Sequence, residues 1–334
     1  NTTPFYTSRS NSFQPRVSAT YAPGKTVLRG GFGIFVGPGQ GEDQIQPMES
    51  DRVSTTLSTG PFLAYPINQD LLVSNFTSNP NNRSYQPGAY ANDYEIPERI
   101  WQYTASVQQD LGDRFALTAA YTWSKSIDAG SSGFFGVEGN SIQNPYNMRP
   151  DRSVSSYDVP HNLVMSWVYD LPFGKGKALR TNNRVADYII GNWQVNGLAD
   201  IRSGAPVNLT IAGDISNTGG NAMRPNVVGE WRVDKSIPAR WFAKEAFAAP
   251  AAFTFGTAGR NVLRGDAVKR MDLSAFRNFP FKERYMAQLR VEGYNVLNVV
   301  TYGNPVAEFT NANFGRVTSA MAARTLQIGA RIYF

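Results

Sequence analysis

Nine segments of the sequence alternate apolar and polar residues with a period of two. This pattern predicts β-strands, because successive side chains of a strand point to opposite faces of a sheet. In the last segment the apolar residues hold the even positions, and the chain ends on the aromatic Phe334. The predicted strands cover residues 13–21, 26–36, 100–110, 114–124, 161–171, 193–202, 270–279, 284–298 and 326–334.

The connections between these strands are of two kinds that alternate along the chain. Short turns are expected at 22–25, 111–113 and 280–282, and long connections at 37–99, 125–160, 203–269 and 299–323. One connection, 172–192, departs from the alternation and contains a possible short helix over 184–190. Segregated short and long loops are typical of outer-membrane barrels, whose periplasmic turns are short and whose extracellular loops are long. The expected fold is therefore an all-β, transmembrane antiparallel β-barrel.

Composition agrees with a barrel rather than with membrane helices. No run of the sequence approaches the roughly 20 apolar residues that a membrane-spanning helix requires. Aromatic residues reach 13% while charged residues reach only 17%. Many aromatic residues with few charges suit the interfacial girdles of a barrel, and a closed barrel also solves the problem of an apolar terminal strand. We expect the chain to reside in a bacterial outer membrane.

The sequence contains little of the chemistry that enzymes and metal sites need. Cysteine is absent and His161 is the only histidine, so a zinc site built from several His or Cys ligands is excluded. No Ser-His-Asp set is expected with a single histidine. The net charge is +6, but the basic residues are scattered, which argues against a nucleic-acid partner. We therefore expect neither an enzyme nor a cofactor.

Strand number and orientation suggest a part of a larger barrel. If the short turns are periplasmic, Phe334 lies at the periplasmic rim and the first strand descends from outside. Nine is odd, whereas single-chain bacterial barrels have even numbers of strands. Residues 1–334 are therefore expected to form the C-terminal part of a barrel, preceded by an odd number of strands, with plug and N-terminal domains absent from this chain.

Three groups of residues are candidates for function. The charged residues that alternate onto the polar, lumen-facing side either pair with each other or a plug or contact a substrate: Arg16, Arg29, Asp200, Arg202, Asp272, Arg290, Glu292 and Arg331. Four acidic residues of the first long connection form either a solvated acidic rim or a calcium site: Glu42, Asp43, Glu49 and Asp51. The C-terminal residues would be an assembly signal for the barrel-assembly machinery: Ile332, Tyr333 and Phe334.

One strand register can be predicted from charge. Centring the turn between strands 270–279 and 284–298 on Phe281 places Asp272 opposite Arg290 and Arg270 opposite Glu292. Two opposite-charge pairs would then line the lumen wall, each contributing about 0.2–1 kcal/mol.

Several stretches resemble the C-terminal barrel half of TonB-dependent receptors of the Oar-like kind, common in Acidobacteria and related bacteria. The resemblance rests on the residues 13–17, 26–35, 169–176 and 292–298 and on the Phe-terminated last strand. It implies a barrel of 22 strands, of which these nine would be strands 14 to 22, with the plug and the TonB box upstream. The implied function is energised uptake of a ligand that extracellular loops capture. The implied partners are outer-membrane lipid, lipopolysaccharide and the TonB system.

Other functions remain open at this point. The loops of an outer-membrane adhesion or assembly protein would bind a partner without any transport. Loops this long disfavour a passive porin. A soluble all-β carbohydrate-binding or glycosidase module would leave the terminal Phe and the loop asymmetry unexplained.

Overall fold

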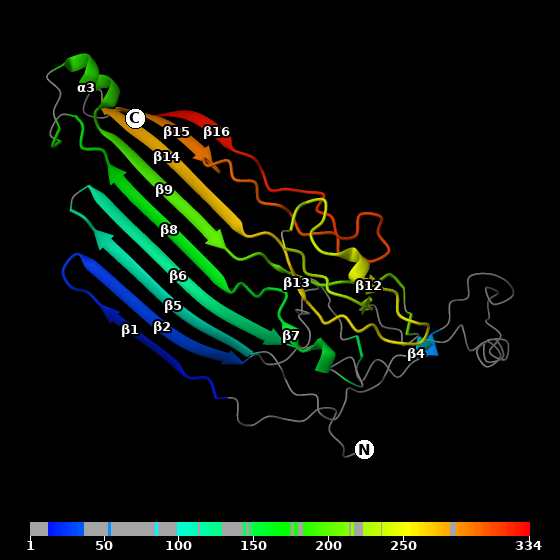
Figure 1. Cartoon of the computed structure of the whole chain (residues 1–334). Coiled ribbons are helices and arrows are strands. Elements are labelled where there is room, and N and C mark those ends of the chain that lie inside the picture. Colours follow the sequence, from blue (N-terminus) through cyan, green and yellow to red (C-terminus); the bar gives the residue numbers. More distant parts are fainter. Residues whose placement is uncertain are drawn as a thin grey trace, which may run out of the picture.

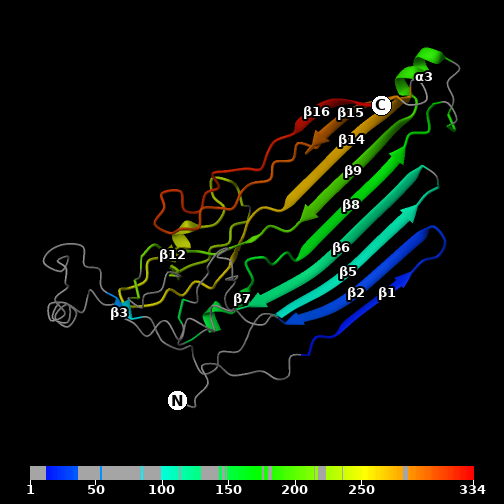
Figure 2. The same cartoon turned by 180° about the vertical axis from the view of Figure 1, so that it is seen from behind.

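A computed structural model describes residues 13–36, 53–54, 84–85, 99–112, 114–128, 143–144, 147, 149–174, 177–179, 183–213, 215–216, 223–234, 236–280 and 285–334. Within them, nine long antiparallel strands form one twisted sheet in which each strand pairs with its neighbour in sequence (Figures 1 and 2). All nine predicted strands are present. They are β1 (Arg16–Tyr21), β2 (Thr26–Val36), β5 (Arg99–Asp110), β6 (Phe115–Asp128), β8 (His161–Asp170), β9 (Trp193–Arg202), β14 (Val268–Pro280), β15 (Met286–Tyr294) and β16 (Thr325–Tyr333).

The sheet is open. β1 and β16 form its two edges and do not pair with each other, so the described strands make a curved wall rather than a closed barrel. The short strand β7 (Ser153–Val154) adds to the end of β6, opposite Ile127 and Asp128.

The predicted segregation of the connections is confirmed. The turn 22–25 and the strand ends that flank the other two short connections lie at one end of the sheet together with the C-terminus, and the described parts of the long connections after β6, β9 and β15 lie at the other end (Figure 1). The helix expected in 172–192 is also present as α3 (Arg184–Ile190), at the short-turn end. We refer to the two ends as the turn end and the loop end.

The predicted register of β14 and β15 is wrong. Phe276, not Asp272, lies opposite Arg290, and Ser274 lies opposite Glu292. The backbone N–H of Asn295 donates to the Asp272 carboxylate at 2.8 Å, which places Asp272 beside the end of β15. The turn is correspondingly longer than predicted, since the strands end at Pro280 and resume at Met286. The shift is an even number of residues, so every side chain keeps its predicted face.

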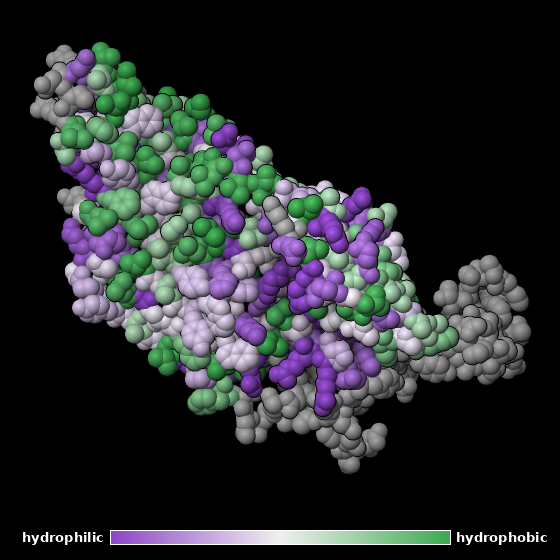
Figure 3. Space-filling model, in the orientation of Figure 1, coloured by the Kyte–Doolittle hydropathy of each residue, from purple (hydrophilic) through white to green (hydrophobic). Residues whose placement is uncertain are grey.

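Aromatic side chains mark both ends of the strands on the apolar face. Trp123 pairs with His161 near the loop end, and its ring centroid lies 5.3 Å from that of Tyr103. Tyr169 lies opposite Phe115 near the turn end, with ring centroids 5.6 Å apart. Green and pale tones predominate over the strands in Figure 3, while strongly hydrophilic residues gather towards the loop end. This distribution is that of aromatic girdles around an apolar band.

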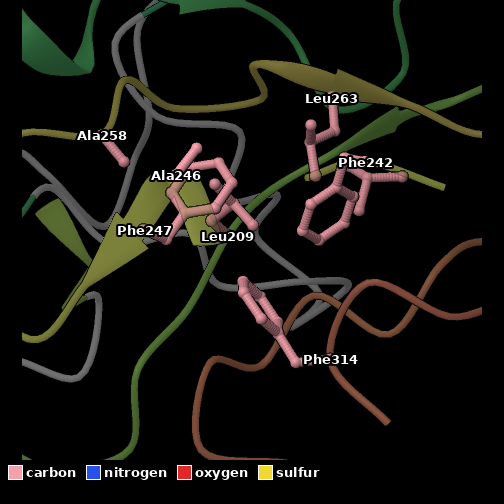
Figure 4. Packing of buried hydrophobic residues seen from close by; sticks show 8 residues of the cluster. Leu209, Phe242, Ala246, Phe247, Ala258, Leu263 and Phe314 are labelled. Carbon is pink, nitrogen blue, oxygen red and sulfur yellow. The ribbon is translucent and has the colours of Figure 1, made fainter. Parts of the chain in front are cut away.

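The main cluster of buried hydrophobic residues in the described part of the chain lies in the loops. Segments from the connections 203–267 and 295–324 pack into a compact body, called the cap below, around Leu209, Phe242, Phe247 and Phe314 (Figure 4). Short ladders shape this body: β10 (Pro206–Val207) pairs with β13 (Leu263–Arg264), and β11 (Asn226–Val227) with β12 (Phe247–Ala248). The remaining short elements are β3 (Val53–Ser54), β4 (Ser84–Tyr85) and the 3-10 helices η3 (Arg149–Asp151) and η4 (Lys244–Ala246).

Candidate functional site

The polar positions of all nine strands form one continuous face. Directly opposed residues in an antiparallel pair of strands share a face. In each of the eight strand pairs, the positions on the polar side of one strand lie opposite those on the polar side of the next. Examples are Arg29 with Ser106, Thr118 with Ser166, and Gln288 with Arg331. The eight charged candidates all lie on this face: Arg16, Arg29, Asp200, Arg202, Asp272, Arg290, Glu292 and Arg331.

The charges of this face pair along a strand rather than across strands. The guanidinium of Arg270 lies 2.9 Å from Asp272, and that of Arg290 lies 3.4 Å from Glu292. Arg202 and Asp200 are 3.7 Å apart. Residues two apart on a strand point to the same side, which allows these contacts. Each pair is partly exposed, so its contribution to stability is small, about 0–1 kcal/mol.

The cap stands at the loop end of this face and has a dense aromatic centre. The ring centroid of Phe242 lies 5.1 Å from that of Phe314 and 5.6 Å from that of Phe247, with the rings edge to face. Leu209 and Ala258 are fully buried beside them. Edge-to-face aromatic pairs add about 0.5–1.5 kcal/mol beyond area burial. The described parts of these loops are therefore folded structure with a core of their own.

Three Arg–Asp pairs connect the cap to β6 and to the connection that follows it. Arg224 lies 2.6 Å from Asp151, and neither side chain is exposed. Arg260 pairs with Asp128 at the end of β6, and also donates to the Asp151 carbonyl at 2.9 Å. A third pair joins Arg264 to Asp158.

Neutral side chains complete this buried network. The side-chain amide of Gln143 donates to the Gly256 carbonyl at 2.8 Å, and its oxygen accepts from the Arg224 N–H at 2.8 Å. Ser126 donates its N–H to Asp158 at 2.8 Å. Breaking a buried pair by removing one partner typically costs about 3–5 kcal/mol, because an uncompensated charge remains. The network therefore fixes the cap relative to the sheet.

Sequence reasoning missed this network. Its arginines and aspartates lie in loops with no periodic pattern, and the sequence separations are 73 residues for Arg224 and Asp151 and 132 for Arg260 and Asp128. The tripeptide Arg264-Gly265-Asp266 belongs to the same region. Arg264 holds Asp158, and Asp266 accepts the N–H of Tyr302 at 2.9 Å, so both side chains have structural partners.

The loop and C-terminal candidates have different positions. Glu42, Asp43, Glu49 and Asp51 lie outside the described residues. Ile332 and Tyr333 end the edge strand β16, and Phe334 follows it with its side chain almost fully exposed. The Arg331 guanidinium lies 4.9 Å from the centroid of the Tyr333 ring.

Outside the strands, one described residue has a shifted pKa. The hydroxyl of Thr310 donates to the Glu308 carboxylate at 2.6 Å, and this bond, with further N–H donors, lowers the pKa of Glu308. One of those donors is Ala212 at 3.3 Å, so Glu308 connects two loops of the cap.

Two other kinds of feature are absent from the described part of the chain. In the part of the chain that the structure describes, no group of three or more His, Cys, Asp or Glu residues could hold a metal ion. No helix among these residues has the length and the apolar composition to cross a membrane.

Comparison with known proteins identifies the fold. No curated protein matches the sequence. A family model described as an outer membrane beta barrel domain matches residues 1–121 and 113–327, most of the chain. The apolar face with aromatic ends, the polar face and the segregated loops agree with that family. The chain belongs to the outer membrane β-barrel domain family, and its place is the bacterial outer membrane.

Proposed function

We propose that the chain forms part of the wall and the extracellular cap of an energised outer-membrane transporter of the TonB-dependent type. The cap would capture a ligand at the cell surface, and the polar face would line its path inward. The observation that carries the proposal is the folded cap, held at the loop end of the polar face by the buried Arg224–Asp151 and Arg260–Asp128 pairs. A capture surface that is ordered before binding loses less conformational entropy when the ligand arrives.

The polar face supports a path for a hydrophilic ligand. It carries Arg16, Arg29 and Arg331 in addition to the strand-wise pairs such as Arg290–Glu292. Among the described contacts, none of these three arginines has a carboxylate partner within ion-pair distance. Their guanidinium groups could pair with acidic groups of a plug or with a ligand, since arginine favours carboxylate and phosphate partners.

The open sheet supports a barrel larger than these strands alone. Each edge strand, β1 and β16, needs a partner in a membrane, because lipid cannot satisfy unpaired backbone groups. Further strands between the two edges would enlarge the lumen enough for a plug. The resemblance to TonB-dependent receptors of the Oar-like kind suggests 22 strands in total.

Conductance and uptake of the full-length protein test this proposal. In planar bilayers, a plugged transporter should be closed and should conduct only after a denaturant reversibly unfolds the plug. Cells that produce the protein should deplete one or more solutes from a defined mixture, and inactivation of TonB should abolish that depletion. A steady open conductance without denaturant would instead identify a passive porin.

An adhesion or assembly protein is the second candidate, because a rigid cap also suits binding to a macromolecular surface. For such a protein, cells would bind a surface or partner equally with and without TonB, and no solute would be depleted. Retained binding with no TonB-dependent depletion would favour this candidate over transport.

A further inference from the structure

Helix α3 lies against the apolar face of the sheet at the turn end. Arg277 and Phe279 belong to the alternating positions of β14 that face away from the polar wall. The guanidinium of Arg277 donates to the carbonyl of Tyr188 in α3. The ring centroids of Tyr188 and Phe279 are 6.0 Å apart, and the indole N–H of Trp193 donates to the Ile189 carbonyl at 2.8 Å. The helix is thus docked on the side of the barrel that meets lipid.

The helix turns its apolar residues outward. Val185, Tyr188 and Ile189 are 66%, 70% and 64% exposed, whereas the charged Asp187 is half-buried. A helix on a water-facing surface shows the opposite arrangement, with its apolar stripe toward the protein and its charges outside. The exposed surface of α3 is therefore unsuited to contact with water.

The helix is held in place by hydrogen bonds at both ends. The Asn183 side chain accepts from the N–H groups of Val185 and Ala186 at 2.8 and 3.3 Å, and so caps the first turn. After the last turn, the N–H of Asn192 donates to the Phe173 carbonyl at 2.9 Å. Gly174, with φ of +119°, packs so closely that a Cβ there would lie 2.8 Å from the Asn192 nitrogen. The exposed apolar residues therefore belong to a helix whose two ends are fixed by hydrogen bonds.

The connection that contains α3 is basic in composition. Among the described residues, Arg277 has no carboxylate within ion-pair distance, although it is largely buried under the helix. In the sequence, the connection 172–192 holds four basic residues and one acidic residue, Lys175, Lys177, Arg180, Arg184 and Asp187, and the Lys177 ammonium lies 3.1 Å from the carboxylate of Asp170 in β8. An exposed apolar helix within a connection of basic composition matches a membrane with anionic headgroups.

We propose that α3 is an interfacial anchor that lies in the periplasmic leaflet of the outer membrane, at the boundary between anionic phospholipid headgroups and acyl chains. Its exposed residues continue the lipid-facing surface of β14 at the turn end, which is the periplasmic end of such barrels. Helices of this kind insert their apolar side about 5–10 Å into the headgroup–acyl boundary. Tyr188 and Trp193 are of the two aromatic types that favour that depth. The proposal depends on the barrel family and not on transport.

Cysteine labelling tests the anchor, because the chain contains no cysteine of its own. The full-length protein, freed of any other cysteine, is reconstituted in phosphatidylethanolamine–phosphatidylglycerol vesicles with an environment-sensitive dye on Ile189→Cys. One matched control is Val168→Cys, which lies on the polar face near the turn end and is 42% exposed. The other is Tyr157→Cys, which is 52% exposed at the loop end.

Lipids brominated near the headgroup should quench the label at residue 189, and aqueous iodide should not. Both controls should show the reverse, and the emission at 189 should be blue-shifted relative to them. Heat-modifiability on gels verifies that each variant is folded. Equal quenching by iodide at 189 and 157 would overturn the proposal. A second result would also overturn it: iodide quenches the label at residue 189 in vesicles but not in intact cells. In that case a protein partner, and not lipid, covers α3.

Discussion

The guanidinium of Arg224 lies 2.6 Å from the carboxylate of Asp151, and both side chains are completely buried. The two residues come from different long connections of the chain, separated by 73 positions. Their contact therefore fixes the connection 203–267 to the connection after β6. It also places two charges where water cannot solvate either one alone.

Removing one of these charges should loosen the cap without unfolding the sheet. We expect Asp151→Ala to lower the stability of the cap by about 3–5 kcal/mol, because the charge of Arg224 would remain buried without a partner. Limited proteolysis of the reconstituted protein should cleave within 203–267 much faster than in the unchanged protein, while heat-modifiability of the barrel persists. The matched control is Glu230→Ala, whose pair with Arg232 is exposed on both sides and should contribute only about 0–1 kcal/mol. Equal cleavage of the two variants would contradict a structural role for the buried pair.

The indole of Trp167 covers Gly197 on the apolar face, so a larger residue at position 197 should destabilise the fold. A Cβ on Gly197 would lie 2.0 Å from the Trp167 ring. We expect Gly197→Ala to cost about 1–3 kcal/mol through displacement of that ring. Urea titration of the folded, heat-modifiable fraction measures the loss.

Two further variants isolate the cause. Gly30→Ala on the same face should be nearly neutral, because its Cβ would meet nothing within 4 Å. Adding Trp167→Ala to Gly197→Ala should lessen the cost of the glycine change. If Gly197→Ala lowers the stability equally with and without Trp167, a clash with that ring is not the cause of the loss.

The two faces of the sheet should respond differently to charge. Arginine at Ala119 or Val195, on the apolar face near mid-strand, should cost about 2–4 kcal/mol. The same substitution at the neighbouring Thr118 or Asn196, on the polar face, should be mild because those positions meet water. Folding yields in lipid vesicles, read from heat-modifiability, distinguish the faces. Similar losses at both kinds of position would mean that the faces are wrongly assigned.

Acid should weaken the contact between the two cap loops that Glu308 joins. The pKa of Glu308 in the folded protein lies below its ordinary value of 4.5, chiefly because the Thr310 hydroxyl donates to the carboxylate. A lowered folded-state pKa means that the stabilisation is fully present above the ordinary pKa and is lost as pH falls through the lowered one. Hydrogen exchange at Ala212, corrected for intrinsic rates, should therefore accelerate at acid pH. Glu308→Gln should show faster exchange already at neutral pH and little further change on acidification, and an unchanged pH profile in that variant would exclude Glu308 as the cause.

The strands, their faces and the ends at which the loops gather can be predicted from the sequence alone. These features are local: a period of two places Thr118 and Ala119 on opposite faces wherever the strand pairs, and short turns such as 22–25 force neighbouring strands to be antiparallel. Even the wrong register of β14 and β15 kept each side chain on its predicted face, because the shift was even.

The contacts between residues far apart in the sequence depend on the complete fold. Asp272 could pair with Arg290 by charge alone, but in the folded chain it bonds to Arg270 and to the Asn295 N–H, and those contacts accompany a different register. The cap network and the docking of α3 on Arg277 have no periodic signal, since Arg260 and Asp128 are 132 residues apart and Arg277 and Tyr188 are 89 apart. Such pairs are chosen by packing and by the cost of burying a charge without a partner, and both depend on the whole fold.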